Sequence, residues 1–403
     1  MFSKYRKLNE IDSIKYVRQK MDIFGADEAI KSEEVGNGNI NYIYRIVGED
    51  RSSVILKQAD NKLRSSGRDL DRDRIRIEAE ALMLEEKLAT GMVPKVYFYD
   101  SDMSCIVMED LSDYEIMRDT LVNYNVWEGF SENITDFLVK TTLPTTDVVL
   151  EQIEKKNRVK QFINPEMCDI SERLVFSQPF KGHKENKVTL ENQKFVEDML
   201  YNDEIINLEV AKLKYEFMTN AQALIHGDLH TGSIFIKEDI IKIFDSEFAF
   251  YGPIGYDVGN VIANLFFPYI RLMVLVEDYK SNKDFELWIR KTIKEVADKF
   301  KEKSLNYIEE NKKEKMSQIE SFSNWYIDQI MRYTAGVTGL EIIRRIVGSA
   351  KVDDIESIKN NEDKAKAERI AVKIAKKFIL NRKELIKGKD YLNIFDKVLD
   401  EEL

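Results

Sequence analysis

The most informative stretch of the chain is IHGDLHTGSIFIKEDIIKIFDSEFAFY, residues 225–251. Two short apolar runs within it, Ile234–Ile236 and Ile240–Phe244, are separated by the charged turn Lys237-Glu238-Asp239. Short apolar runs on either side of a polar turn are typical of a tight β-hairpin. We therefore predict a hairpin whose two ends lie side by side.

Acidic motifs stand at both ends of the predicted hairpin. His-Gly-Asp (226–228) precedes the first apolar run, and Asp-Ser-Glu (245–247) follows the second. Because a hairpin folds its ends together, Asp228 is expected close to Asp245 and Glu247. Three neighbouring carboxylates repel one another unless a cation lies among them, and Mg²⁺ held against nucleotide phosphates is such a cation. The motif therefore predicts a magnesium-nucleotide phosphoryl-transfer site.

A purely structural hairpin is the alternative, because Asp and Glu are common turn residues and His-Gly-Asp is short enough to arise by chance. The distribution of histidine argues against this alternative. The chain has only three histidines, His183, His226 and His230, and two of them lie within five residues at this motif. Together with the predicted hairpin around the motif, this favours a functional site.

The composition is that of a soluble protein with a sizeable core. The chain has 403 residues, of which 43% are hydrophobic and 33% charged, and this suits two domains or one domain with two lobes. Its formal net charge of −11 argues against a nucleic acid or an anionic membrane as a partner. The basic cluster Arg64–Arg76 alternates with aspartates, so we expect a solvated loop that runs into a helix.

Cysteine usage and apolar patterning predict a cytoplasmic protein without a membrane span. Cys105 and Cys168 form no CxxC pair and provide no disulfide framework, which fits a reducing compartment. The charged N-terminal segment is unlike a signal peptide. The most apolar long stretch, Val258–Val276, is interrupted by polar residues and is predicted to be a buried helix. Because histidine and cysteine are scarce, any metal should be bound by oxygen atoms.

The N-terminal residues predict a helix followed by a small antiparallel sheet. Apolar residues recur at helical spacing over residues 9–24. Residues 32–47 and 51–58 then have the pattern of a strand, a glycine turn, a second strand and a third strand. Gly36 and Gly38 would let a phosphate approach the backbone without a Cβ atom in the way, although an ordinary hairpin turn is the alternative.

Lys57 stands near the end of the third predicted strand, where a charge is costly without a partner. A helix is predicted over residues 72–90, and it carries two candidate partners, Glu78 and Glu80. A strand lysine paired with a helix glutamate is how protein-kinase-like folds hold the α- and β-phosphates of ATP. The pattern therefore predicts a nucleotide site, and the helix phase does not choose between the two glutamates.

Strands predicted over residues 93–99 and 105–108 complete the sheet and run into Glu109-Asp110-Leu111. An acidic pair at the end of an apolar strand suits a hinge whose backbone binds an adenine edge, and a plain strand end is the alternative. We expect an α+β, protein-kinase-like fold of two lobes. Residues 1–109 would form a nucleotide-binding lobe with a small antiparallel sheet, and residues 110–403 a larger, mainly helical lobe for catalysis and substrate binding.

Apart from the hairpin, helical patterning dominates the C-terminal lobe. The segment 164–180, which contains two of the six prolines, is predicted to be loop-rich. The segments with a helical pattern are 126–142, 148–161, 190–201, 203–223 and the tail 284–403.

Arg344 and Arg345 lie in LEIIRRIVG, an otherwise apolar helix. Adjacent residues point about 100° apart on a helix, so the two arginines cannot belong to one solvent-facing stripe. At least one is expected to turn inward and to contact an anion. A salt bridge to an internal Asp or Glu and a contact with substrate or a phosphoryl group are equally good interpretations.

These motifs together resemble the 5-methylthioribose kinase family, within the wider aminoglycoside-phosphotransferase and choline-kinase group. The resemblance runs through most of the chain, and its segments are VGNGNINYIY (35–44), ILKQA (55–59), VMEDLS (107–112), FINPEMCDISERLVFSQPF (162–180), AKLK (211–214), LIHGDLHTGSIF (224–235), FDSEFAFYGPIGYDVGNVIANLF (244–266) and EIIRRIVG (341–348). The most discriminating position is Ser233, where the wider group usually has asparagine. The Asp-x-Glu that replaces the Asp-Phe-Gly of protein kinases is a second mark.

The resemblance implies ATP-dependent phosphorylation of the 1-hydroxyl of 5-methylthioribose in methionine salvage, with Mg²⁺ as cofactor and a homodimer as the working form. It implies that Asp228 orients the sugar hydroxyl or accepts its proton. Arg344, with Arg345 as a second candidate, would contact the substrate and the transferring phosphoryl group. The metal ligands would be Asp245 and Glu247. The implied cofactor-binding residues are Asn41, Lys57, Glu78, Glu109, Asp110, Leu111, Asp245, Ser246 and Glu247.

Two departures from the family bear on the acceptor. Residues 60–73 contain no aromatic residue where family members usually carry a tryptophan-containing loop, and Ser246 stands where proline is frequent. One alternative is therefore a kinase of the same fold for another 5-modified ribose or an amino alcohol. The arginine pair favours a sugar, because a quaternary ammonium needs an aromatic cage. The other alternative, a silent nucleotide-binding module, is disfavoured because the full set of charged site residues is present.

Overall fold

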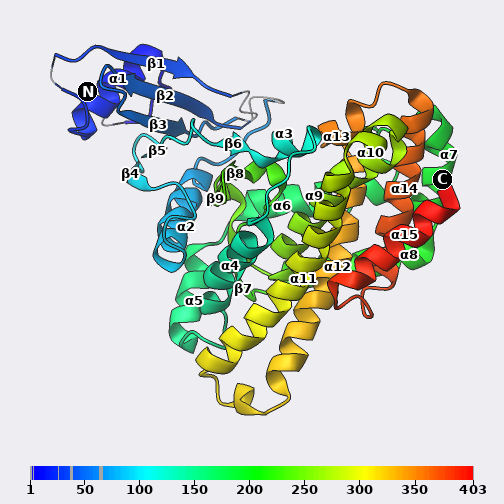
Figure 1. Cartoon of the computed structure of the whole chain (residues 1–403). Coiled ribbons are helices and arrows are strands. Elements are labelled where there is room, and N and C mark those ends of the chain that lie inside the picture. Colours follow the sequence, from blue (N-terminus) through cyan, green and yellow to red (C-terminus); the bar gives the residue numbers. More distant parts are fainter. Residues whose placement is uncertain (1, 3, 26, 37–39, 63–66, 403) are drawn as a thin grey trace.

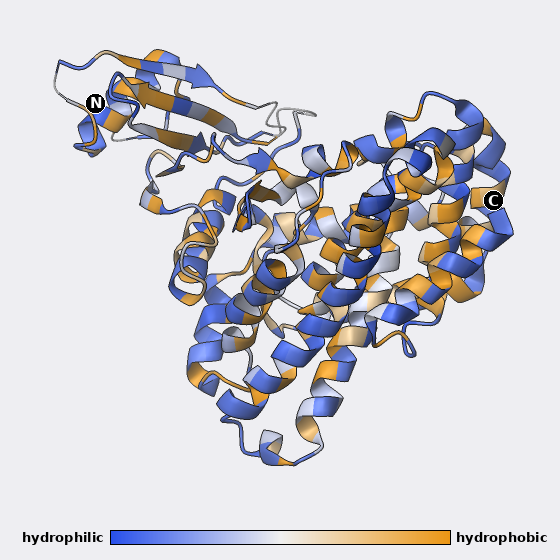
Figure 2. Cartoon of the chain, viewed as in Figure 1, coloured by the Kyte–Doolittle hydropathy of each residue, from blue (hydrophilic) through white to orange (hydrophobic). Residues whose placement is uncertain are grey.

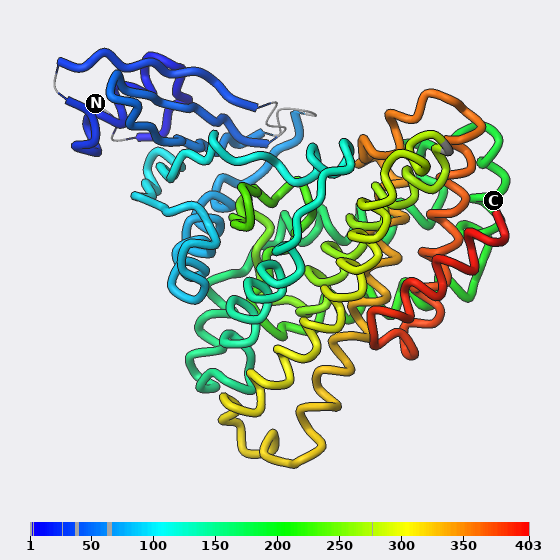
Figure 3. Tube along the Cα trace, in the orientation of Figure 1, coloured from blue at the N-terminus to red at the C-terminus, as the bar shows by residue number. Residues whose placement is uncertain are grey.

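The computed structural model describes residues 2, 4–25, 27–36, 40–62 and 67–402. It has a small sheet-containing part at the N-terminal end and a larger helical part that contains the C-terminus (Figures 1 and 3). This confirms the predicted α+β arrangement of a small antiparallel sheet and a mainly helical remainder. Across the described residues, every helix is too short or too polar to span a bilayer.

Five antiparallel strands form the N-terminal sheet, in the order β1-β2-β3-β5-β4. Alternate side chains of β2 and β3 face an apolar layer, and helix α1 (Glu10–Lys20) covers this layer with Tyr16 and Val17. The strands are β1 (Ile30–Glu34), β2 (Tyr42–Gly48), β3 (Ser53–Gln58), β4 (Val96–Asp100) and β5 (Cys105–Glu109). In the predicted glycine turn, Gly36 has φ +75°, and Gly38 lies outside the described residues.

Helix α2 (Arg74–Leu88) connects the sheet to the helical part. Ile75 and Ala79 pack into a cluster with β5, whereas Ile77 and Ala81 pack into a cluster with residues of the C-terminal part. Residues four apart lie on the same face of a helix, so α2 has two apolar faces that serve two different partners. The lobe boundary between residues 109 and 110 stays a prediction.

The predicted hairpin is confirmed as β8 (Ile234–Lys237) and β9 (Ile240–Ile243), and β6 (Glu115–Ile116) adds a third strand. A second pairing, which was not predicted, joins β7 (Ala223–Ile225) to β10 (Phe250–Gly252) just outside the hairpin. The two ladders therefore hold the intervening acidic segments side by side, since β7 precedes the first segment and β10 follows the second.

The C-terminal part is built on α9 (Gly255–Val274) and α12 (Phe322–Ile346), which pack against each other. Almost all side chains of α9 are buried, as predicted for this apolar stretch. In Figure 2 the near face of the outer helix α11 (Lys283–Asn311) is largely hydrophilic. The other helices are α3 (Met117–Val122), α4 (Phe130–Thr142), α5 (Gln152–Gln161), α6 (Pro165–Leu174), α7 (Gln193–Val196), α8 (Glu204–Thr219), α10 (Val276–Ser281), α13 (Asp353–Glu356), α14 (Asn361–Leu380) and α15 (Gly388–Glu402).

Two local predictions were wrong. The segment predicted to be loop-rich contains α6, whose first residue is Pro165. Proline is well suited to the first helical position, because its missing N–H has no partner there in any case. The helix predicted over residues 203–223 ends at Thr219, and the chain then forms β7. A strand of three residues is too short to produce a periodic pattern.

Candidate active site

A cavity of about 470 Å³ lies between the five-stranded sheet and the β8–β9 hairpin. The Phe235 and Phe244 rings line one side and stack on each other, with centroids 4.4 Å apart and an angle of 29° between planes. Ile43, Ile55 and Met108 of the sheet also line the cavity. A cavity of this volume with apolar sheet and hairpin surfaces suits a flat aromatic ligand.

A larger cleft of about 750 Å³ lies elsewhere on the helical part. Its lining consists mostly of charged side chains, and none of the predicted site residues is among them.

Lys57, at the polar end of the smaller cavity, is almost fully buried and pairs with two carboxylates. Its Nζ lies 2.7 Å from Glu78 Oε1, and it also donates to Asp245. Burial alone would lower the pKa of Lys57, but Asp245 and Glu78 raise it above its usual value, so the group stays charged. Glu80 instead contacts Arg76 at 2.8 Å. The structure therefore makes Glu78 the partner of Lys57.

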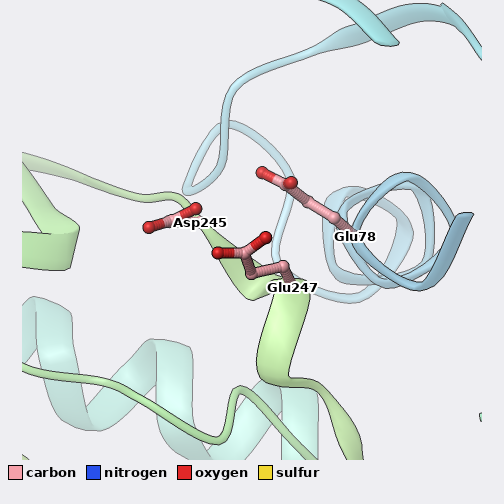
Figure 4. A group of neighbouring side chains, drawn as sticks. All are labelled: Glu78, Asp245 and Glu247. Atoms are coloured by element: carbon pink, nitrogen blue, oxygen red, sulfur yellow. The ribbon is translucent and has the colours of Figure 1, made fainter. Parts of the chain in front are cut away.

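Glu78, Asp245 and Glu247 each place a carboxylate oxygen within 4.8 Å of the others (Figure 4). Burial raises the pKa of Glu247, and the nearby charge of Asp245 raises it further. Within the described chain, the cations that pair with these acids are Lys57 and Arg74. When all are ionised, the three carboxylates exceed the two cations by one negative charge, and burial raises the pKa of Glu78 to about 8 because that charge is costly there. Oxygen ligands in such a group fit a divalent cation.

Arg74 and Asn41 hold Glu247 in place. Asn41 Nδ2 donates to Glu247 at 2.8 Å, and Asn41 Oδ1 accepts from the Arg74 guanidinium at 3.0 and 3.2 Å. Arg74 Nε also lies 3.5 Å from Glu247. Because Arg74 is only 2% exposed, the prediction that the basic segment is solvated is wrong at this residue. Residues 63–66 of that segment lie outside the described residues.

The predicted hinge residues line the cavity, and both acidic side chains are bound by cations of the protein. Glu109 accepts from Lys242 Nζ at 2.6 Å, and Asp110 accepts from Arg45 Nε at 2.7 Å. Leu111 contributes a buried apolar side chain to the same edge. Since the carboxylates are engaged, the backbone groups of this segment are the natural contacts for a ligand.

Ser246 lies between the two candidate metal ligands and is the first residue of the short turn η6 (Ser246–Phe248). Its Oγ donates to Glu85 of α2 at 3.2 Å, so the side chain points away from the cavity. On the other side, Asn164 Nδ2 donates to the backbone carbonyls of Glu247 and Ala249 at 2.8 and 3.1 Å. The turn is therefore held by a buried side chain from each of two helical segments.

Asp228 lies in a separate centre. Arg344 Nη1 donates to its Oδ1 at 3.0 Å, and His230 Nε2 lies 3.5 Å from its Oδ2. Burial alone would raise the pKa of Asp228, but Arg344 and His230 hold it well below its usual range. Burial lowers the pKa of His230 to about 4, so the imidazole is neutral at pH 7. Asp245 and Glu247 gather with a glutamate of α2 within 4.8 Å, and Asp228 lies outside that group. Burial and the charge of Asp228 both oppose the lowering of the pKa of Asp245 by Lys57, so the two hairpin ends do lie near each other as predicted.

Both arginines of α12 turn inward toward the same fully buried acid, Glu341. Arg344 Nη1 lies 3.1 Å from Glu341 Oε2, and Arg345 Nε lies 2.6 Å from Oε1. The spacings of three and four residues place these side chains on one helix face. Each arginine therefore has the internal acid that one interpretation predicted, and of the two it is Arg344 that also reaches Asp228.

The His-Gly-Asp turn has a backbone that only glycine fits. Gly227 has φ +82°, and a Cβ atom there would lie 2.3 Å from the carbonyl oxygen of Phe248. Asp257 of α9 accepts from the backbone N–H groups of His226 and Gly227 at 2.6 and 3.0 Å. These bonds fix the backbone immediately before Asp228.

Sequence reasoning missed several residues that position the site, namely Arg74, Asn164, His230, Asp257 and Glu341. The last had a usable signal, because it precedes the two arginines by three and four residues in a predicted helix. His230 belongs to the motif whose two histidines favoured a functional site, but its place beside Asp228 was not predicted. Arg74, Asn164 and Asp257 reach the site through tertiary packing, and no periodic pattern around them indicated it.

The chain is similar over nearly its full length to curated methylthioribose kinases. It is 35% identical over 395 residues to that of Geobacillus sp. (strain WCH70), covering 97% of this chain and 96% of the relative. It is 33% identical over 381 residues to that of Erwinia tasmaniensis, with 94% and 95% covered. It is 33% identical over 405 residues to that of Bacillus pumilus, with 98% of each covered.

Solved structures similar to the chain are more distant. A Plasmodium vivax ethanolamine kinase is 14% identical, with 92% of this chain and 91% of that chain covered and a TM-score of 0.45. The GDP complex of aminoglycoside 2'-phosphotransferase-IIIa is 12% identical, with 98% and 100% covered and a TM-score of 0.42. No family model matches the chain. On the strength of 33–35% identity across almost the whole of each relative, the chain belongs to the methylthioribose kinase family.

Proposed function

We propose that the protein transfers the γ-phosphoryl group of ATP to the 1-hydroxyl of 5-methylthioribose, giving 5-methylthioribose 1-phosphate and ADP in methionine salvage. The similarity to methylthioribose kinases supports the choice of acceptor. The observation that carries the reaction type is the pairing of Lys57 with Glu78 and Asp245 at the polar end of a mainly apolar cavity. This is the arrangement that kinases use to hold ATP phosphates.

In this proposal the adenine ring occupies the apolar part of the cavity, with the Phe235–Phe244 pair on one side. Its polar edge faces the backbone of Glu109 and Leu111, because the side chain of Glu109 is bound elsewhere. Lys57 then contacts the phosphates, and Glu78 holds the ammonium group in place.

Asp245 and Glu247 are the residues that would hold Mg²⁺. The ion, when bound, offsets the charge of the β- and γ-phosphates and of the carboxylates themselves. The fit rests on the excess negative charge of the group and on its oxygen ligands. Asn41 and Arg74 keep Glu247 turned toward the cavity, and Glu78 stays with Lys57.

Asp228 accepts a hydrogen bond from the sugar hydroxyl and directs its oxygen toward the γ-phosphorus. Because Arg344 keeps the pKa of Asp228 well below its usual range, the carboxylate is ionised but only weakly basic. Orientation is therefore its larger contribution, and an anomeric hydroxyl, being more acidic than an ordinary alcohol, needs less help from a base. Arg344 also offsets the charge that arrives with the phosphoryl group.

Replacing Asp228 by alanine should separate chemistry from nucleotide binding. We expect turnover to fall by about 10²–10⁴-fold, in the range of a positioned acid–base group, while ATP still binds. ADP release and calorimetric ATP titration measure the two quantities. Asp239→Ala, at an exposed aspartate in the hairpin turn, is the matched control and should leave both unchanged. Near-normal turnover in Asp228→Ala would contradict the assignment.

A panel of acceptors separates the proposed function from its alternatives. ADP formation is measured with 5-methylthioribose, other 5-modified riboses and amino alcohols. Turnover with only another acceptor would change the substrate, and turnover with none would favour a silent nucleotide-binding module.

We further propose a homodimer on the family resemblance, a cytoplasmic location on cysteine usage, and two lobes, 1–109 and 110–403, on the order of the predicted elements. Sedimentation should give twice the mass of the chain. Limited proteolysis should cleave near the boundary between the lobes.

A further inference from the structure

Arg118 is a half-buried arginine next to the Asp228 centre. It lies on α3, which follows β6 and packs against the turn η5 (Thr231–Ser233). Within the described part of the chain, its Nε and Nη2 atoms are shielded from solvent and form no hydrogen bond. Leaving charged donors buried and unpaired is costly, so a folded protein that does so calls for a functional explanation.

Gly232 provides the space for this guanidinium group. A Cβ atom on Gly232 would lie 2.8 Å from Arg118 Cζ and 2.9 and 3.0 Å from its two terminal nitrogens. The Arg118 side chain therefore reaches the backbone of the turn that follows His230, at a glycine four residues after Asp228. Gly232 is not in the left-handed region, so the close approach of Arg118, and not backbone conformation, is what excludes a larger residue.

The guanidinium groups around Asp228 offer more hydrogen-bond donors than the neighbouring carboxylates use. Three guanidinium groups, of Arg118, Arg344 and Arg345, lie near three carboxylates, Asp354, Glu341 and Asp228, and the ion pairs of Asp228 and Glu341 use only the α12 arginines. Buried nitrogens without a partner also remain on Arg344 and Arg345 among the described residues. Such a set of free guanidinium donors fits an anion with several oxygen atoms.

We propose that Arg118 is a further substrate-binding residue, and that together with the α12 arginines it binds the phosphate group of the sugar 1-phosphate formed in the reaction. The ligand class is a phosphate monoester of a sugar, and the proposal rests on the proposed function. The alternative is that Arg118 pairs with Asp354 of the protein and not with a phosphate group. The buried Asp354 carboxylate interacts with Arg118 through charge, and its Oδ1 has no hydrogen bond among the described residues.

The test uses α-D-ribose 1-phosphate, which carries the ester without the methylthio group, and neutral 5-methylthioribose. Calorimetry measures both affinities for the wild type and for Arg118→Met. We expect the affinity for the ester to fall about 10- to 100-fold, which is the strength of a charge-assisted hydrogen bond. The affinity for the neutral sugar should change less than about threefold, because that sugar lacks the anion.

Two further variants probe the same contact. Arg118→Lys keeps the charge but loses the planar fork, so it should retain only part of the affinity for the ester. Gly232→Ala should displace the guanidinium group and weaken ester binding, and its effect should not add to that of Arg118→Met in the double variant. The matched control is Arg290→Met, at an arginine that Asp396 binds at 2.7 Å, and it should leave ester affinity unchanged.

Thermal unfolding distinguishes binding from a structural role. Replacing an unpaired buried charge by an apolar side chain should leave the Tm of Arg118→Met unchanged or higher. A lower Tm with wild-type ester affinity would make Arg118 a structural partner of Asp354 and overturn the proposal. Equal losses for ester and neutral sugar would overturn it too, since Arg118 would then bind hydroxyl groups.

The proposal and the proposed function can fail separately. If the wild type phosphorylates 5-methylthioribose but Arg118→Met binds the ester normally, this result refutes only the role proposed for Arg118. If the wild type phosphorylates no acceptor, the proposed function is refuted. Ester binding that depends on Arg118 would in that case still support an anion site. A wild type that does not bind the ester overturns the role of Arg118.

Discussion

Replacing Glu341 by glutamine tests how α12 keeps two arginines in the interior. The carboxylate is fully buried and pairs with Arg344 at 3.1 Å and Arg345 at 2.6 Å. Glutamine keeps the shape but removes the charge. Arg344 then retains Asp228 at 3.0 Å, whereas Arg345 loses the one carboxylate it pairs with among the described residues. Removing one partner of a buried ion pair typically costs about 3–5 kcal/mol.

We therefore expect Glu341→Gln to lower the free energy of unfolding by about 3–5 kcal/mol, measured by urea denaturation at pH 7. The choice of pH follows from the sign of the pKa shift. Burial alone would raise the pKa of Glu341, but the two arginines hold it below its usual value. Such a group contributes stability above its unfolded pKa and loses it as the pH falls through the folded pKa, so the full contribution is present at neutral pH.

A second substitution separates charge from packing. Adding Arg345→Met to Glu341→Gln removes the uncompensated guanidinium group and should restore about 1–4 kcal/mol. Glu368→Gln is the matched control, because this carboxylate is 2% exposed but is bound by Thr189 and Asn192, which are uncharged. It should cost less than Glu341→Gln and gain nothing from Arg345→Met. A double variant less stable than Glu341→Gln alone would refute the reasoning.

The two turns of the site and the buried imidazole give three further expectations. Gly227→Ala should cost about 1–3 kcal/mol in thermal unfolding, because the positive φ and the Phe248 carbonyl both oppose a Cβ atom. Asp245→Asn should raise the Mg²⁺ concentration for half-maximal turnover by about tenfold or more, and chelation should abolish turnover of the wild type. Burial lowers the folded pKa of His230 to about 4, so the unfolded chain takes up the proton first and stability falls as the pH drops from about 6.5 toward 4. Urea titrations across that range should show a smaller fall for His230→Gln.

Short continuous motifs account for the parts of the site that the sequence predicted well. The hairpin is specified by two apolar runs and a charged turn within a dozen residues, and each run forms the strand expected of it. Lys57 lies on a strand and Glu78 on the helix that follows it. Their pairing therefore becomes a candidate once this one strand and this one helix are assigned correctly. Local pattern fails where an element is too short to repeat, as in β7, or where proline starts a helix at Pro165.

The charge balance of the two centres could not be predicted, because it depends on arginines whose local sequence is polar. Arg74 stands in the segment RDRIR and Arg118 in MRDT, and both patterns are typical of solvent-facing residues. Each becomes buried only through contacts with distant segments, Arg74 with Glu247 and Arg118 with the turn at Gly232. The two centres therefore differ chemically. Carboxylates gather around Lys57, where a cation would offset their charge, and guanidinium groups with free donors gather around Asp228. A phosphoryl group that leaves ATP therefore moves toward guanidinium groups already in place, which stabilises the charge it carries without reorganisation of the site.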